Sequence, residues 1–377
     1  MIEALGIGHL FALSRTEAIA GFFTPLAVFA VFLAAQLILP ARRVPGYVID
    51  PETGEPRPYR LNGILVFALA LAVWASGITG LPLDWFYRSA VPAVIGGTVF
   101  SAVFTVLAVR GRRKTGSLAA DLWHGRALEI ALFGGRFDVK MYLYVVGGTM
   151  FALNALSGAA YHYERFGADA NPGVFLYAAL FTFYVLDYFV FERVQLYTYD
   201  LIHEKLGFKL LWGGLIVYGW LFALPLWGMA ARPDPGFPPA WTNAWLIGTA
   251  ALFLFGWSIS RGANLQKYTF KRWPGRRFLG LVEPEYIEAG ERRILCSGLW
   301  GAARHFNYLG EGVLALSIAL VFGYPGNPWA WTYFVFIVSL FLWRERADDR
   351  HCARKYGSEK WAEYRARVKY RIFPGVY

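Results

Sequence analysis

Long runs of apolar residues, broken by short polar connections, fill most of the chain. A helix that crosses a bilayer needs roughly 17 to 25 mostly apolar residues, because it rises about 1.5 Å per residue through a hydrocarbon core about 30 Å thick. The last two runs are short, and the polar-studded stretch 297–308 before them suggests a half-buried or re-entrant helix. The pattern predicts an all-α, polytopic integral membrane protein with about nine to ten transmembrane helices. The expected spans are 19–40, 63–82, 90–109, 141–160, 173–191, 209–230, 243–259, 309–323 and 328–343.

Basic residues are segregated between the connections. When the spans are threaded through a bilayer, one side receives the segments 41–62, 110–140, 192–208, 260–297 and 344–377. Only Arg15, Arg88, Arg165 and Arg232 fall on the other side. Because Lys and Arg concentrate in cytoplasmic connections, we expect a cytosolic carboxyl terminus and an amino terminus that faces out. The membrane would be a bacterial inner membrane, or the endoplasmic reticulum in a eukaryote.

The composition agrees with a membrane protein. Apolar residues make up 56% of the chain and charged residues only 17%, whereas soluble domains carry about 25% charged residues. The net charge of +11 does not indicate a nucleic-acid partner, because most basic residues flank predicted spans. Two clusters, 261–277 and 344–371, exceed what orientation requires. A soluble polyanion could dock there, and a phosphate-rich dinucleotide is a candidate.

Several common site types are not indicated. Cys296 and Cys352 form no CxxC pair, and the histidines lack ligand spacing, so no metal site is expected. There is no GxGxxG or Walker loop, which excludes a standard nucleotide-binding domain. No internal repeat of the solenoid type is visible.

Six sequence blocks carry a resemblance to a known family. The stretch DDRHCARKYGSEKWAEYRARVKYRIFPGVY, residues 348–377, closely resembles the terminal signature of the membrane sterol reductases. That family comprises the sterol C14 reductases, the lamin B receptor core and the 7-dehydrocholesterol reductases. Further similar blocks follow the family's order: YRLNG (59–63), GRALEIALFGGRFDVK (125–140), residues 187–208, NLQKYTFKR (264–272) and SGLWGAARHFNYLGEG (297–312). The resemblance covers the chain from about Tyr59 to Tyr377.

This resemblance implies an enzyme that reduces a ring double bond of a sterol, Δ14 or Δ7, with NADPH. An acid protonates the alkene, and hydride then quenches the tertiary cation in a pocket that excludes water. The expected partners are a sterol or sterol-like lipid and membrane lipids, with no nucleic acid. We expect a single domain, 1–377, in which 1–260 holds the amino-terminal spans and the substrate side. Residues 261–377 would form the NADPH-binding half, with the cofactor pocket in the carboxyl-terminal third.

The resemblance also implies which residues bind the cofactor. Lys267 and Lys271 would hold its phosphates, with Lys271 where the family commonly has Arg. Considered alone, the lysines are ordinary juxtamembrane charges, Trp300 an interfacial anchor and Cys352 a packed small residue. Asp348, Cys352, Lys355 and Tyr356 are spaced at i, i+4, i+7 and i+8, which places all four side chains on one face of a helix. The full set is Lys267, Lys271, Leu295, Trp300, Asn307, Tyr308, Asp348, Cys352, Lys355, Tyr356 and Tyr364.

Acids within or at the edge of predicted spans are candidate proton donors: Asp187, Glu192, Asp200 and Glu311. A carboxyl group kept protonated by burial suits the protonation of an alkene. Glu192 and Asp200 match acidic positions of the family block, and Asp348 joins them as a candidate catalytic acid. Alternatively, Glu192 and Asp200 cap helices or pair with Arg193 and Lys205 at the membrane surface, and both interpretations stay open.

The substrate side departs from the family more than the cofactor side does. The family's FDxKxFxELRPG becomes FDVKMYLYVVGG, so that Tyr144, Val146 and Gly147 replace Glu, Arg and Pro. The spelling ARHFNY at 303–308 favours the 7-dehydrocholesterol reductases mildly. Two other functions stay open: an isoprenylcysteine-type membrane methyltransferase that uses S-adenosylmethionine, and a non-catalytic sterol-binding protein. The blocks at 264–272 and 352–356 favour the reductase.

Overall fold

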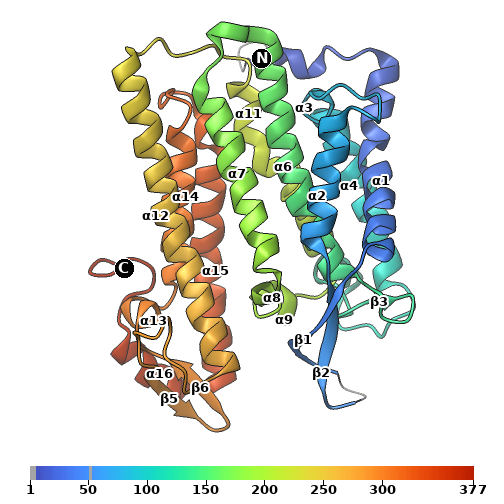
Figure 1. Ribbon diagram of the computed structural model, residues 1–377. Coiled ribbons are helices and arrows are strands. Elements are labelled where there is room, and N and C mark those ends of the chain that lie inside the picture. The colour runs from blue at the N-terminus through green and yellow to red at the C-terminus, as the bar shows by residue number, and fades with distance from the viewer. Residues whose placement is uncertain (1–5, 51–52) are drawn as a thin grey trace. The chain divides into compact units, whose positions relative to one another are not determined.

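The chain folds into two compact units, Met1–Gly236 (unit 1) and Phe237–Tyr377 (unit 2), in a computed structural model that describes residues 6–50 and 53–377 (Figure 1). The packing boundary precedes helix α12 (Pro239–Arg272). The expected functional boundary at 260/261 falls inside this helix. The functional division therefore stays a prediction, and α12 belongs as a whole to unit 2.

Unit 1 is a helix bundle built around α6 (Val139–Phe166). In the most apolar stretch of the span that contains α6, 89% of the residues are buried, so this helix forms the centre of the unit. Helix α1 (Arg15–Ile38) begins with a capping box, in which Ser14 and Glu17 each accept the other's backbone N–H. It packs along α4 (Ala90–Val109). The other helices of unit 1 are η1 (Gly8–Phe11), α2 (Gly63–Ser76), α3 (Trp85–Arg88), α5 (Leu118–His124), η2 (Gly167–Asp169), α7 (Pro172–Val190), α8 (Glu192–Gln195), α9 (Tyr199–Ile202), α10 (Phe208–Trp212), η3 (Gly213–Val217), η4 (Leu221–Ala223) and α11 (Leu224–Met229).

Unit 2 is organised by α12, α14 (Phe306–Leu320) and α15 (Thr332–Tyr356), which run side by side (Figure 1). Two glycines let α12 and α14 approach closely. A Cβ atom at Gly256 would lie 2.7 Å from the Gly310 carbonyl oxygen, and one at Gly310 would lie 2.5 Å from the Ser260 nitrogen. Small residues of this kind are typical of helix contacts inside membranes. The remaining helices are α13 (Leu299–Ala302), η5 (Pro328–Trp331) and α16 (Ser358–Arg367).

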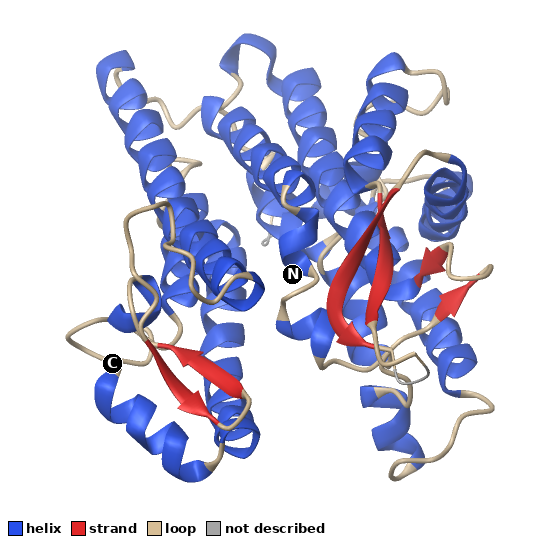
Figure 2. Cartoon of the chain, turned by 60° about the horizontal axis from the view of Figure 1, so that its bottom comes forward, coloured by secondary structure: helices blue, strands red, loops and turns tan. Residues whose placement is uncertain are grey.

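Short β-hairpins correct the expected all-α fold to a mostly helical one. The described residues form three two-stranded antiparallel sheets (Figure 2). In unit 1, β1 (Arg42–Ile49) pairs with β2 (Pro56–Leu61), and β3 (Ala131–Leu132) with β4 (Phe137–Asp138). In unit 2, β5 (Tyr286–Ala289) pairs with β6 (Arg292–Leu295).

All nine predicted spans coincide with helical segments, but the structure supports fewer crossings. Five helices are long and apolar enough to span a bilayer: α1, α4, α6, α7 and α12. A sixth is possible if Phe208–Val217 and Leu221–Met229, bent by 48°, make one broken span. Helices α2 and α14 are apolar but shorter. The expected nine to ten crossings are therefore not confirmed, and crossing by α2, α14 and α15 stays a prediction.

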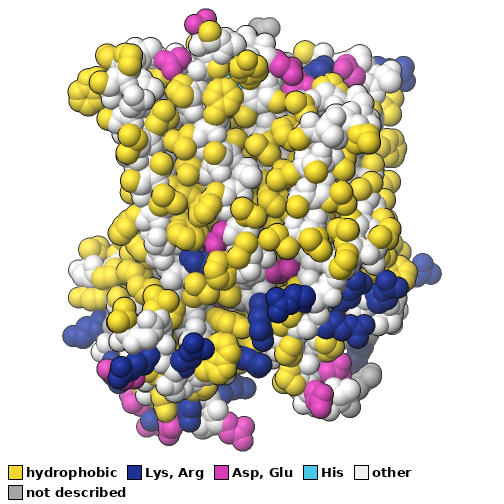
Figure 3. All heavy atoms as spheres, viewed as in Figure 1, with side chains coloured by type: hydrophobic (Ala, Val, Ile, Leu, Met, Phe, Trp, Pro, Cys, Tyr) yellow, Lys and Arg dark blue, Asp and Glu magenta, His cyan; other side chains and the backbone are white. Residues whose placement is uncertain are grey.

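Charged side chains gather at the ends of the long helices, while the visible flanks are mostly hydrophobic (Figure 3). In unit 1 the Lys and Arg side chains collect at the end that carries the β1–β2 hairpin. In unit 2 they collect at the end that carries the β5–β6 hairpin. This arrangement within each unit agrees with the segregation read from the sequence.

Candidate functional site

Two long helices of unit 2 position most of the predicted cofactor residues. Lys267 and Lys271 lie one turn apart near the carboxyl end of α12. The predicted helical face from Asp348 to Tyr356 is confirmed, because α15 extends through Tyr356. The helix ends at Gly357, whose φ of 86° suits glycine and starts the turn into α16.

Trp300 links these helices to the short helix α13. The Lys267 Nζ atom lies 5.1 Å from the centre of the Trp300 ring, a cation–π contact. The Trp300 indole donates to the Ala263 carbonyl at 2.7 Å, and the Tyr364 hydroxyl donates to the Trp300 carbonyl at 3.5 Å. Trp300 is therefore fixed inside unit 2 by several contacts and is not simply an anchor at the bilayer interface.

A second polar contact joins α14 to α15. The Tyr308 hydroxyl donates to a carboxylate oxygen of Asp348 at 2.7 Å. The Tyr308 ring stacks on Phe341 and His305, with ring centres 4.2 and 4.9 Å apart. Burial and the nearby cations, first among them Lys267, lower the pKa of His305 to about 3, so this ring is neutral. The site therefore presents one carboxylate beside neutral aromatic rings.

Positive charge accumulates around Cys352. Lys267, Lys271 and Lys355 lie within electrostatic range of one another and of this thiol. Burial, and then the charge of Lys267, lowers the pKa of Lys355. Neither Lys267 nor Lys355 forms an ion pair within the part of the chain that the structure describes. Half-buried cations that repel one another favour an anionic ligand.

The remaining predicted residues form an apolar wall and supply one polar side chain, that of Asn307. Leu295 is buried, and Cys352 and Tyr356 pack against a core cluster that includes Tyr364. Burial raises the pKa of Cys352 to about 11, so the thiol stays protonated and acts as a packing group. The Asn307 Oδ1 atom is buried and accepts no hydrogen bond from the described residues, which leaves an acceptor for a ligand. All eleven predicted residues thus lie in unit 2.

The three predicted acids do not form one cluster within either unit. Asp348 belongs to unit 2, whereas Glu192 and Asp200 belong to unit 1. Glu192 is 5% exposed, and both of its carboxylate oxygens accept the Gly63 N–H at 3.3 Å. Burial raises the pKa of Glu192 to about 7. Asp200 is half-buried on α9 and lies within electrostatic range of Lys140. The raised pKa of Glu192 suits this carboxyl to donating a proton near neutral pH.

A group of tyrosines lies next to Glu192 in unit 1. The Tyr144 ring stacks on Tyr188 at 4.2 Å, and Tyr188 meets Tyr218 edge to face at 6.3 Å. Tyr144 also lies within electrostatic range of Glu192. Gly147 makes this arrangement possible, because a Cβ atom there would lie 2.4 Å from the Gly214 carbonyl oxygen. The departures at 144 and 147 therefore build an aromatic cluster where the family has charged residues and proline.

Sequence reasoning missed a buried polar cluster in unit 1. The Tyr59 hydroxyl donates to Glu129 at 3.2 Å, and Lys140 lies 3.3 Å from the same carboxylate oxygen. Arg57 lies 3.8 Å from Asp138. Burial, followed by the charge of Asp138, raises the pKa of Glu129 to about 7. One signal in the sequence could have indicated this cluster. Blocks 59–63 and 125–140 both match the family, and these two segments supply Tyr59, Glu129, Asp138 and Lys140.

Among residues 6–50 and 53–377, no three His, Cys, Asp or Glu side chains gather in a way that could hold a metal ion. The class defined so far is a polytopic membrane protein with a basic, aromatic site in its carboxyl-terminal unit. A sequence model of the ergosterol biosynthesis ERG4/ERG24 family matches residues 10–377. The chain therefore belongs to this family, which confirms the resemblance read from its sequence blocks.

Named relatives are similar over most of the chain. The Delta(14)-sterol reductase of Methylotuvimicrobium alcaliphilum is 35% identical over 356 residues, 91% of this chain and 80% of the relative. The Delta(14)-sterol reductase of Arabidopsis thaliana is 32% identical over 367 residues, 93% of this chain and 95% of the relative. The Delta(14)-sterol reductase TM7SF2 of Mus musculus is 29% identical over 377 residues, 94% and 86% of the two chains.

Proposed function

We propose that this chain is an NADPH-dependent reductase of a ring double bond in a sterol, embedded in the membrane with its carboxyl terminus in the cytosol. The observation that carries this proposal is the lysine group of unit 2, Lys267, Lys271 and Lys355, set against Trp300 and the Tyr308–Asp348 pair. It occurs in a chain whose relatives are named Delta(14)-sterol reductases over more than nine tenths of its length.

The residues of unit 2 fit a dinucleotide phosphate chemically. Clustered lysines suit phosphates, flat aromatic rings suit the bases, and the Asn307 oxygen suits an amide or amine donor. NADPH supplies a hydride when bound. The chain's own task is then to hold the phosphates with Lys267, Lys271 and Lys355 and to keep the ring pocket dry. The apolar wall formed by Leu295, Tyr356 and Tyr364 serves the second purpose.

Glu192 is our proposed source of the proton. Its pKa of about 7 leaves much of the carboxyl protonated at neutral pH, as protonation of an alkene requires. Tyr144 and Tyr188 lie between α6 and α7 beside it, and their hydroxyls could pass the proton onward. The carboxylate of Asp348 accepts from Tyr308 and orients that ring in the cofactor site. Asp200 is half-buried near Lys140, and we assign it no catalytic role.

The double bond at Δ14 is our preferred substrate position. The mild sequence preference for the 7-dehydrocholesterol reductases rests on a few residues at 303–308. The relatives named Delta(14)-sterol reductase match nearly the whole chain. Similarity over nearly the whole chain is stronger support for Δ14 than the few residues at 303–308 are for Δ7.

Cofactor binding separates this proposal from the methyltransferase alternative. We expect the purified protein in detergent to bind NADPH and not S-adenosylmethionine. Lys267→Ala removes a half-buried charge from the lysine group that would hold the phosphates, and it should raise the Kd for NADPH roughly 10- to 100-fold. Lys360→Ala is the matched control, because the side chain of that lysine is exposed on α16 and pairs with its neighbour Glu363.

Titration by fluorescence or calorimetry measures these affinities. Tight binding of S-adenosylmethionine by the native protein would contradict the proposal. So would an unchanged NADPH affinity in Lys267→Ala. A protein that binds sterol and NADPH without turnover would be a non-catalytic member of the family.

A further inference from the structure

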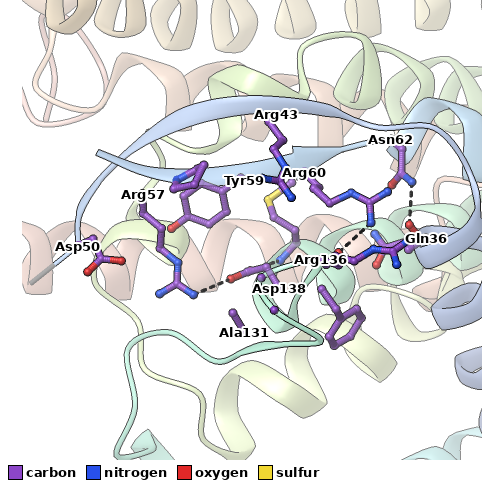
Figure 4. Close-up of a pocket in the computed structure, with 15 residues that line it drawn as sticks. Gln36, Arg43, Asp50, Arg57, Tyr59, Arg60, Asn62, Ala131, Arg136 and Asp138 are labelled. Atoms are coloured by element: carbon purple, nitrogen blue, oxygen red, sulfur yellow. Dashed lines mark hydrogen bonds and ion pairs between the residues drawn. The ribbon is translucent and has the colours of Figure 1, made fainter. Parts of the chain in front are cut away.

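A pocket in unit 1 lies apart from the residues assigned above. It has a volume of about 400 Å³ and lies between the β1–β2 hairpin and the segment 131–141 (Figure 4). Four arginines line it: Arg43, Arg57, Arg60 and Arg136. Two carboxylates, Asp50 and Asp138, also line it, so its formal charge is positive.

The hairpin register places two of these arginines directly opposite each other. Arg43 on β1 pairs with Arg60 on β2 in the antiparallel ladder. Directly opposed side chains have Cβ atoms roughly 4.5–5.5 Å apart, and like charges in that position destabilise a hairpin. Burial lowers the pKa of Arg60, and the charges of Arg136 and Arg43 lower it further. The fold therefore concentrates cations that repel one another.

The described carboxylates do not neutralise this group. Asp138 lies 3.8 Å from Arg57. Across residues 6–50 and 53–377, Arg43, Arg60 and Arg136 form no ion pair with a carboxylate. A counterion from outside the described chain would offset their repulsion.

Helix α1 accounts for only part of the arginines' hydrogen bonding. Arg60 donates to the Leu39 carbonyl at 3.3 Å, and Arg136 donates to the Leu37 carbonyl at 3.1 Å, at the carboxyl end of α1. Arg60 also donates to the Arg136 carbonyl at 3.2 Å. Each guanidinium carries five N–H donors, so several remain in each group for a ligand. The hydrogen bonds to the end of α1 explain the positions of Arg60 and Arg136, but they do not explain why Arg43 lies beside them.

The position of the pocket indicates where its ligand comes from. Helix α1 is long and apolar enough to span a bilayer, and Ile38 at its end is 81% exposed. The arginines begin at Arg42 and Arg43, immediately after this apolar stretch. Lipid phosphates lie at the boundary between the hydrocarbon core and water, and basic pockets at this depth bind anionic headgroups.

We propose that the arginine pocket of Arg43, Arg60 and Arg136 binds a phosphate group, supplied by the headgroup of an anionic phospholipid. Arginine's planar fork suits phosphate oxygens through paired hydrogen bonds. The lipid's tails would lie along the exposed apolar side chains of α1. This site is independent of the proposed reductase activity.

Lipid binding by the full-length protein tests the proposal. The protein is purified in neutral detergent and titrated with phosphatidylglycerol, phosphatidylcholine or inorganic phosphate, with native mass spectrometry and thermal unfolding as readouts. We expect phosphatidylglycerol to be retained and to raise Tm. The double variant Arg43→Gln/Arg60→Gln should weaken retention at least tenfold. Arg113→Gln/Lys114→Gln is the control, since it removes two exposed charges of the predicted cytosolic side outside the pocket.

A second signature separates a lost site from a misfolded protein. Without lipid, Arg43→Gln/Arg60→Gln should unfold about 1–2 °C higher than the native protein, because the opposed charges are gone. If inorganic phosphate were retained and the lipid were not, the pocket would still bind phosphate, but the phospholipid headgroup would be the wrong source of it. Equal phosphatidylglycerol retention in native, pocket and control proteins would overturn the proposal. Loss of NADPH binding in the pocket variant, with no lipid effect, would overturn it as well.

Discussion

At the scale of single residues, burial decides which acids can donate a proton. Glu192 and Asp200 look alike in the sequence, since both match acidic positions of one family block. The structure buries Glu192 against the backbone of Gly63, while Asp200 remains half-buried on a short helix. Sequence patterns could name both residues but could not rank them, because depth of burial depends on packing between distant segments.

Glu192→Gln tests the proton donor. Glutamine keeps an acceptor for the Gly63 N–H but cannot donate a proton as a carboxylic acid does. We expect kcat to fall by roughly 10²- to 10⁴-fold. The native rate should decline as pH rises through about 7, because the carboxyl then loses its proton. The variant's residual rate should lack this decline. If the variant kept the native kcat and the native pH profile, Glu192 would not be the proton donor and would have a structural role only.

Glu129 should make stability depend on pH. Its pKa is raised from 4.5 to about 7 in the folded chain. The folded state therefore holds this proton more tightly than the unfolded state, and the resulting stabilisation is complete below pH 4.5 and lost between 4.5 and 7. Glu129→Gln should flatten the fall in Tm between pH 5 and 7. Thermal unfolding in detergent measures this, and an identical slope in both proteins would count against the assignment.

The predicted cofactor residues show what spacing alone can predict. The face from Asp348 to Tyr356 follows from helical periodicity, and α15 confirms it. The contact of Tyr59 with Glu129 joins positions 70 residues apart, and no local period signals it. The aromatic cluster at Tyr144 likewise depends on how η3 packs against α6.

At the scale of elements, apolar length predicted the helices well and the strands not at all. Each predicted span contains a helix, because twenty apolar residues leave few other ways to satisfy backbone hydrogen bonds in a membrane. The strands are short, and β1 carries Arg42, Arg43 and a proline among its few apolar residues. Their pairing depends on contact across the hairpin, which a one-dimensional pattern does not contain.

The α12–α14 contact depends on Gly310. Gly310→Ala places a Cβ atom 2.5 Å from backbone, and neither helix can yield locally. We expect a loss of roughly 1–3 kcal/mol in unfolding free energy. Gly312→Ala is the control on the same helix, since nothing lies within 4 Å of its Cβ position. That variant should be neutral or slightly stabilised. Equal Tm values for the two variants would show that the helices do not pack at Gly310.

At the scale of the whole molecule, the direction of insertion follows from the distribution of basic residues. A green fluorescent protein fused after Tyr377 should fluoresce in bacterial cells, and an alkaline phosphatase fused at the same place should be inactive. Fluorescence is expected because basic connections are generally retained in the cytosol. An active phosphatase fusion would reverse the topology and place the lysine site away from cellular NADPH.

The central claim is that this chain reduces a sterol double bond with NADPH. The most direct measurement incubates purified protein and NADPH with Δ14, Δ7 and Δ24 sterols and identifies the products by mass spectrometry. Our account predicts a product two mass units heavier from the Δ14 sterol, with NADPH consumed in equal amount and no product from Lys267→Ala at low cofactor concentration. Unchanged sterols throughout, with the native protein folded and NADPH bound, would contradict it.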